Sequence, residues 1–155
     1  MNKHFCMIPW VHMHIWPAGK TFPCCMSDPD LPIGDTQIQS LQEIWNGEKL
    51  RTIRQNMIAD KPSPECRRCY ELEENNMWTL RNSSNENFKH HYDKVIATDK
   101  DGYAGEVNMA YMDIRFSNLC NLKCRSCGPQ FSSSWFEDHT KTHGNPGHPK
   151  ILKVR

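Results

Sequence analysis

Eight cysteines are the residues of this 155-residue chain with the clearest chemical potential. Three of them, Cys120, Cys124 and Cys127, lie at the spacing C-x-x-x-C-x-x-C. Thiolates on so short a loop can bind three irons of an iron–sulfur cube and leave the fourth iron without a protein ligand. The spacing therefore predicts a metal centre with one open coordination position, where a small molecule can bind and react.

Four further cysteines, Cys6, Cys24, Cys66 and Cys69, can form a second site, with Cys25 left over. Cys66 and Cys69 form a tight C-x-x-C pair, whereas the other two come from much earlier in the chain. Four thiolates can close a site completely, around either Zn²⁺ or a [4Fe–4S] cluster. The spacing alone does not choose between these two metals.

A β-hairpin is predicted to bring the distant members of this second set together. Apolar and polar residues alternate through residues 10–16, and a Pro-Ala-Gly-Lys sequence then supplies turn residues. A hairpin here places Cys6, before its first strand, near Cys24 at the end of its second. His12 and His14 share one face of the first strand and could line a site, although half-buried strand histidines are the more common case.

Two helices are predicted between the hairpin and the C-x-x-C pair. Thr36 and Gln39 fit a capping box, and residues 27–35 before them form a loop rich in Pro, Asp and Gly. Apolar residues then recur at helical spacing: Ile38, Leu41, Ile44 and Trp45. A second apolar stripe is expected to pack in the core, with polar residues mostly on the opposite face: Leu50, Ile53 and Met57 against Lys49, Arg51, Arg54 and Gln55. Pro62 and Pro64 then stop the helix.

A strand before the three-cysteine loop and a helix after it are predicted to position this loop. An apolar, β-prone run over residues 111–117 predicts a strand that leads directly into Cys120, and Ser132 to Ser134 can cap a following helix. Residues 81–105 are rich in Asn, Ser, Lys and Asp, with few apolar residues, which predicts a polar linker or irregular connection. A short helix is expected between Cys69 and this stretch.

Composition excludes several classes of function. Nineteen basic and 18 acidic residues give a net charge of +1, so the chain lacks an electrostatic footprint for nucleic acid or an anionic membrane. Apolar residues are 37% of the chain, which predicts a thin core tied together by metal or disulfides. The sequence has neither a convincing signal peptide nor a membrane-spanning apolar run. We therefore expect a cytoplasmic protein, where paired cysteines are more often metal ligands or redox groups than structural disulfides.

The strand and the C-N-L-K-C-R-S-C motif at residues 120–127 resemble the start of a radical S-adenosylmethionine (SAM) enzyme. In that family the open iron binds the amino and carboxylate groups of SAM. The resemblance implies that a [4Fe–4S] cluster on Cys120, Cys124 and Cys127 passes an electron to SAM and generates a 5′-deoxyadenosyl radical. It also implies a small-molecule or peptide substrate and an electron donor such as flavodoxin or ferredoxin.

The earlier cysteines resemble a second module of the same family. Cys6, then Gly19-x-x-x-x-Cys24, and later Cys66-x-x-Cys69 are similar to the auxiliary-cluster module called SPASM or, in its shorter form, twitch. The amino-acid sequences of the two predicted helices are also similar to that module. The resemblance implies that these four cysteines bind an auxiliary [4Fe–4S] cluster, which relays an electron or binds substrate.

The expected fold is α+β. Residues 1–80 form a small cysteine-rich β-hairpin with helices, residues 81–105 a polar linker, and residues 106–155 the first βα unit of an α/β radical SAM barrel. Because the barrel of the family extends much further than residue 155, we expect the chain to be an incomplete fragment of the enzyme.

Two other interpretations stay open. Cys124, Cys127, His139 and His143 nearly match the spacing of a C₂H₂ zinc finger, although this leaves Cys120 unexplained and the basic residues that bind DNA are missing. Alternatively, both cysteine sets are structural, in a non-catalytic interaction module that binds zinc or an iron–sulfur cluster. Binding of SAM distinguishes the enzyme from this module, since it requires an open iron.

Overall fold

The computed structural model describes residues 2–154, so Met1 and Arg155, the ends of the first and last predicted segments, lie outside it. The chain has a mixed α+β fold with a four-stranded sheet. The strands are β1 (His14–Ile15), β2 (Lys20–Phe22), β3 (Gly34–Asp35) and β4 (Asp113–Ile114). The α-helices are α1 (Leu41–Trp45), α2 (Glu48–Ile58), α3 (Arg67–Glu74), α4 (Leu80–Asn87), α5 (Asp93–Ile96) and α6 (Phe136–His143). Short 3₁₀ helices are η1 (Ile8–Trp10), η2 (Pro64–Cys66), η3 (Lys89–His91) and η4 (Ser133–Trp135).

The predicted hairpin is confirmed as the antiparallel pair β1 and β2, with His14 opposite Phe22. Gly19 in its turn has a φ of 92°, and a Cβ atom there would lie 2.5 Å from the Asp35 carboxylate, so the turn requires glycine. The first strand is shorter than the alternation predicts. The chain before it is helical in η1, where the fixed φ of Pro9 suits a first helical turn.

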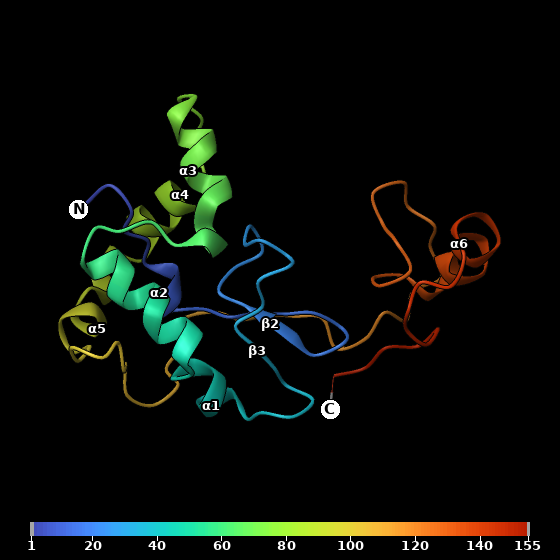
Figure 1. The fold of residues 1–155 in the computed structure, drawn as a ribbon, viewed down its shortest axis with the longest axis horizontal. Coiled ribbons are helices and arrows are strands. Elements are labelled where there is room, and N and C mark those ends of the chain that lie inside the picture. Colours follow the sequence, from blue (N-terminus) through green and yellow to red (C-terminus); the bar gives the residue numbers. More distant parts are fainter. Residues whose placement is uncertain (1, 155) are drawn as a thin grey trace.

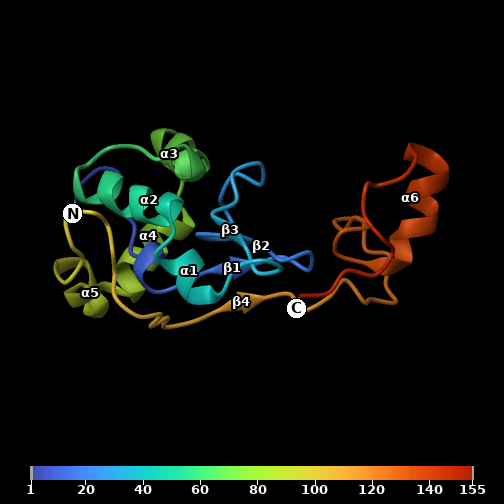
Figure 2. The same ribbon diagram turned by 60° about the horizontal axis from the view of Figure 1, so that its bottom comes forward.

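The sheet has the order β3-β2-β1-β4. β4 lies parallel to β1, with Asp113 beside His14 and Ile114 beside Ile15. The strand predicted before the three-cysteine loop is therefore present, although only two of its residues are in the ladder. β3 was not predicted, because its two residues lie at the end of residues 27–35, whose Pro, Asp and Gly content predicts a loop. In Figure 2, β4 runs beside β1 and continues toward α6.

α1 begins later than the sequence predicts. Ser40 caps it in a capping box, in which the backbone N–H of Glu43 donates to Ser40 Oγ over 3.2 Å. The Thr36 and Gln39 pair does not cap the helix, because both residues bind the hairpin region: the Thr36 N–H donates to the Gly19 carbonyl and Gln39 Oε1 accepts from the Asp35 N–H. Ile38 is 83% exposed and so is not part of the core stripe.

The stripe on α2 is confirmed, since Leu50, Ile53 and Met57 are all fully buried. They pack in a core with residues of the N-terminal segment and α1: Phe5, Met7, Ile8, Trp10, Val11, Met13, Ile44 and Trp45. Arg54 was placed on the polar face, yet it is fully buried. The difference arises because its guanidinium donates to backbone carbonyls inside the molecule, at Pro9 (3.0 Å) and Trp45 (2.8 Å).

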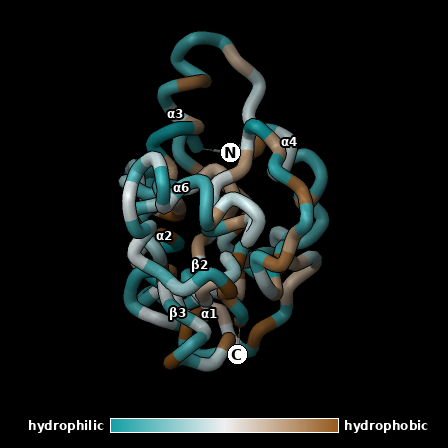
Figure 3. Tube along the Cα trace, turned by 90° about the vertical axis from the view of Figure 1, so that its right-hand side faces the viewer, coloured by the Kyte–Doolittle hydropathy of each residue, from teal (hydrophilic) through white to brown (hydrophobic). Residues whose placement is uncertain are grey.

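Residues 81–105 are not irregular as their composition predicts, because they contain most of α4 and all of α5. α4 begins with a reciprocal capping box between Thr79 and Asn82. Its polar side chains bind the N-terminal segment, and Val95 of α5 is buried in the core. The turn between α3 and α4 projects from the body of the molecule (Figures 1 and 3).

Residues after β4 form a C-terminal unit, separated from the other helices by the sheet (Figure 1). The predicted helix after Ser132 to Ser134 is confirmed as α6. Phe131 docks this unit on the hairpin, with its ring 5.0 Å from the ring of Trp16, and the Arg115 guanidinium lies 4.6 Å from the same ring. Within residues 2–154, every helix is too short or too polar to cross a membrane.

Candidate metal centres

The four cysteines predicted to form the second site line one cavity. Cys6 precedes η1, Cys24 follows β2, and Cys66 and Cys69 come from the end of η2 and the first turn of α3. The hairpin and the η2–α3 junction therefore bring together thiols that are far apart in sequence. The remaining lining is mostly apolar: Ile8, Pro9, Pro23, Met26, Met57 and Leu80, with Arg81 at one side.

Burial in the cavity disfavours the charged thiolate form of the cysteines unless a positive charge compensates it. Burial, and next the neighbouring Cys24, raises the pKa of the Cys6 thiol, while burial raises the pKa of Cys24 to about 12. Burial also raises the pKa of Cys66 well above its ordinary value. A metal ligand has to be a thiolate, so a cationic group must replace the protons when it binds. Four cysteine thiols that line one cavity fit a bound cationic metal centre.

The chemistry of these donors fits either a single Zn²⁺ or an iron–sulfur cluster. All eight cysteines are free thiols. Throughout residues 2–154, no group of three or more His, Cys, Asp or Glu side chains is placed to hold one metal ion. A structural Zn²⁺ would draw four sulfurs to about 2.3 Å from one point. A [4Fe–4S] cluster instead interposes iron and sulfide between its cysteines, so its ligand thiols lie further apart.

The three-cysteine loop lies in the C-terminal unit. Cys124 is exposed, while Cys120 and Cys127 are partly buried. Neighbouring side chains hold the loop backbone: Ser134 Oγ donates to the Cys120 carbonyl over 2.7 Å, and Trp135 Nε1 donates to the Cys124 carbonyl over 3.1 Å. The three thiols therefore belong to one loop of the C-terminal unit and differ in exposure, and their role as cluster ligands stays a prediction.

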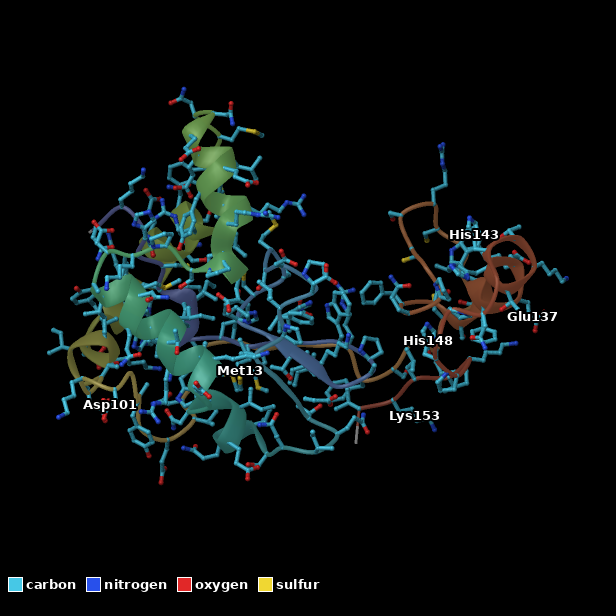
Figure 4. The ribbon with its side chains drawn as sticks, in the orientation of Figure 1. Met13, Asp101, Glu137, His143, His148 and Lys153 are labelled. Atoms are coloured by element: carbon cyan, nitrogen blue, oxygen red, sulfur yellow. The ribbon has the colours of Figure 1, made fainter. Side chains whose placement is uncertain are left out.

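The zinc-finger alternative is not supported by the structure. His139 and His143 lie on α6 with their rings 5.0 Å apart, and His139 Nδ1 is 3.3 Å from the Gly144 carbonyl. In the described part of the chain, they do not join Cys124 and Cys127 in a group that could hold one ion. Figure 4 shows His143 in the C-terminal unit, well away from Met13 in the body of the molecule.

His12 and His14 have structural partners at the contact between β1 and β4. Trp16 Nε1 donates to His14 Nε2 over 2.9 Å, so the other ring nitrogen, Nδ1, carries the proton and lies 2.8 Å from the Asp113 carboxylate. The His12 ring stacks on Tyr111 with centroids 3.9 Å apart, and burial lowers the pKa of His12 to about 4. Both are buried neutral histidines that join β4 to the hairpin.

Sequence reasoning missed the contribution of α4 to the four-cysteine cavity. Asn85 binds the backbone on both sides of Cys6: it accepts from the Met7 N–H (2.8 Å) and donates to the Phe5 carbonyl (3.0 Å). Arg81, one helical turn earlier, lines the cavity itself. Their spacing of four residues places both on one face of α4. Because both are polar, they give no apolar periodicity from which this helix could be predicted.

Comparison with known protein families matches residues 6–70 to the family described as SPASM, an iron–sulfur cluster-binding domain. The matched segment begins at Cys6 and ends one residue after Cys69, so it contains all four cysteines that line the cavity. It covers less than half of the chain and does not reach the three-cysteine loop. No curated protein and no solved structure matches the chain. Residues 6–70 are therefore similar to iron–sulfur cluster-binding domains, as the cysteine spacing predicts.

Proposed function

We propose that this chain is part of a radical SAM enzyme with two [4Fe–4S] clusters, acting in the cytoplasm. Cys120, Cys124 and Cys127 bind the cluster that holds SAM, and an auxiliary cluster occupies the four-cysteine cavity. One observation carries the proposal: the four cysteines within the segment that matches an iron–sulfur family converge on one cavity.

The residues around the four-cysteine cavity orient the ligands and exclude water. The hairpin fixes Cys24 relative to Cys6, while Asn85 fixes the backbone on both sides of Cys6. The apolar lining keeps water from the site. A cluster bound there supplies one-electron chemistry at a closed site whose protein ligands are complete.

The open loop has a different role. When bound to three cysteines, a [4Fe–4S] cluster supplies the electron for reductive cleavage of SAM, and the protein contributes ligation and orientation. Ser134 and Trp135 hold the loop backbone, and the exposed position of Cys124 leaves that side accessible to SAM. A small-molecule or peptide substrate and an electron donor such as flavodoxin or ferredoxin complete the proposed reaction.

Addition of SAM to the reduced protein tests this proposal. The full chain is prepared anaerobically with iron and sulfide, as wild type and as the variants Cys66→Ala, Cys124→Ala and His139→Gln. We expect SAM to change the electron paramagnetic resonance (EPR) signal of the wild type, Cys66→Ala and His139→Gln proteins, since their three-cysteine loop is intact. Cys124→Ala should lose about four irons and show no response to SAM.

Two results would contradict the proposal. A signal that SAM leaves unchanged in all four proteins would favour the non-catalytic iron–sulfur module. Loss of the metal from Cys124→Ala and His139→Gln alike would favour a site that uses the α6 histidines.

A further inference from the structure

We propose that Arg81, from α4 beyond the matched segment, is a positioning residue that sets the reduction potential of the cluster in the four-cysteine cavity. The inference rests on the proposed function, because it assumes that Cys6, Cys24, Cys66 and Cys69 bind a [4Fe–4S] cluster.

Arg81 is fixed to the chain segments that carry the ligands at both ends of the set. Its side chain is only 11% exposed, and Nη1 donates to the carbonyl of Phe5 over 3.0 Å, immediately before Cys6. Its guanidinium carbon also lies 5.7 Å from the ring centroid of Tyr70, the residue after Cys69. The positive charge is therefore held at the wall of the cavity rather than in solvent.

Glu73 determines the orientation of this guanidinium. Its carboxylate forms an ion pair with Arg81 Nη2, accepts from Nε over 3.0 Å, and is itself bound by the Thr79 hydroxyl. Within the described chain, the cavity lining has no charged side chain besides Arg81. Arg81 and Cys6 line the same cavity, and the bond to the Phe5 carbonyl holds the guanidinium on the side of the site that carries this ligand.

A fixed positive charge favours the reduced form of a bound cluster. Reduction from the 2+ to the 1+ core adds one electron to a site that already carries four thiolates, and no bond is made or broken. Net charge near the cluster is one of the factors that set its potential. The field acts through a buried, apolar environment, where solvent screens it less than at the surface. Removing the charge should therefore lower the potential.

Three substitutions separate charge from structural support. Arg81→Gln removes the charge, Arg81→Lys keeps it, and Glu73→Gln leaves the arginine charge uncompensated. Asn87→Ala is the matched control, since Asn87 is an exposed, uncharged residue of the same helix and does not line the cavity.

The test uses the full chain with Cys120, Cys124 and Cys127 replaced by alanine, so that one cluster is present. After anaerobic reconstitution and metal analysis, EPR-monitored titration with dithionite as the electron donor gives the potential. At a fixed potential we expect Arg81→Gln to lower the ratio of reduced to oxidised cluster by about tenfold, which is ~59 mV for one electron. Glu73→Gln should shift the ratio the opposite way, while Arg81→Lys and Asn87→Ala stay close to the parent protein.

Equal potentials in the parent protein, Arg81→Gln and Glu73→Gln would overturn the role of Arg81. If Arg81→Gln fails to retain iron, Glu73→Gln and Arg81→Lys still decide the question through the sign of their shifts. A parent protein that assembles no cluster would contradict the proposed function itself. A cluster whose potential is the same with and without the charge of Arg81 would contradict only the role of Arg81.

Discussion

His12 and the four thiols around the cavity illustrate two kinds of buried titratable residue. His12 lies in the contact between β1 and β4, where its ring stacks on Tyr111 and Nδ1 lies 3.2 Å from the Tyr111 carbonyl. The residue types and spacing of the cysteines predict that they act together as metal ligands. Nothing local in the sequence predicts that His12 is completely buried, because its burial depends on a strand about a hundred residues away.

We expect acid to destabilise the protein partly through His12. In the unfolded chain this histidine has its ordinary pKa of about 6.5, whereas in the folded protein burial lowers the pKa to about 4. As the pH falls below 6.5 the unfolded state gains a proton that the folded state does not bind until near pH 4. Stability is therefore lost across this range, by at most about 1.4 kcal/mol per pH unit.

Urea unfolding of His12→Gln at about pH 7 and about pH 5.5 checks this expectation. The free energy of unfolding should fall less between the two pH values in His12→Gln than in the wild type. His143→Gln, which alters an exposed histidine, serves as the control and should keep the wild-type loss. An equal loss in the wild type and His12→Gln would show that His12 does not contribute.

Among the elements, α2 and α4 differ in how far sequence predicts them. The apolar stripe of α2 has helical periodicity, so its existence and core-facing residues follow from the pattern. α4 has few apolar residues and is held by its capping box and by side-chain bonds from Arg81 and Asn85 to the N-terminal segment. Such long-range polar contacts leave no periodic signal, so composition alone suggested a linker.

Arg54 contacts three parts of the fold, so its substitution measures how much these contacts around α2 contribute to the free energy of unfolding. Besides the carbonyls of Pro9 and Trp45, its guanidinium reaches the Gly102 carbonyl at 3.3 Å. Lysine carries the same charge, but all its donors leave from one nitrogen, whereas Arg54 binds these carbonyls through both Nε and Nη1. We expect Arg54→Lys to reduce the free energy of unfolding by about 2–4 kcal/mol, since buried carbonyls lose their partners.

Urea denaturation measures this loss, with Arg51→Lys as the matched control on the same helix. Arg51 makes an exposed bond to the Asp101 carbonyl, so its replacement should cost less than about 1 kcal/mol. Equal stability of Arg54→Lys and the wild type would mean that the fork geometry of the buried arginine is unimportant.

At the scale of the whole molecule, β4 connects the two cysteine sites. Its parallel pairing with β1 fixes the start of the C-terminal unit (Figure 2). Phe131 then packs against Trp16 on the hairpin. The presence of two separate cysteine sets, and their order along the chain, could be predicted from spacing. The pairing of β4 with β1 could not, because a parallel pair distant in sequence has no local pattern that identifies its partner.

The metal content of the four-cysteine cavity is the most direct test of the account. The full chain with Cys120, Cys124 and Cys127 replaced by alanine is prepared anaerobically with iron, sulfide and zinc all available, then analysed for each. We predict a brown protein with about four irons and four sulfides per chain, both of which are lost when Cys66 is also replaced by alanine. A colourless protein that holds one zinc per chain, or iron that persists without Cys66, would contradict the assignment of this cavity to an iron–sulfur cluster.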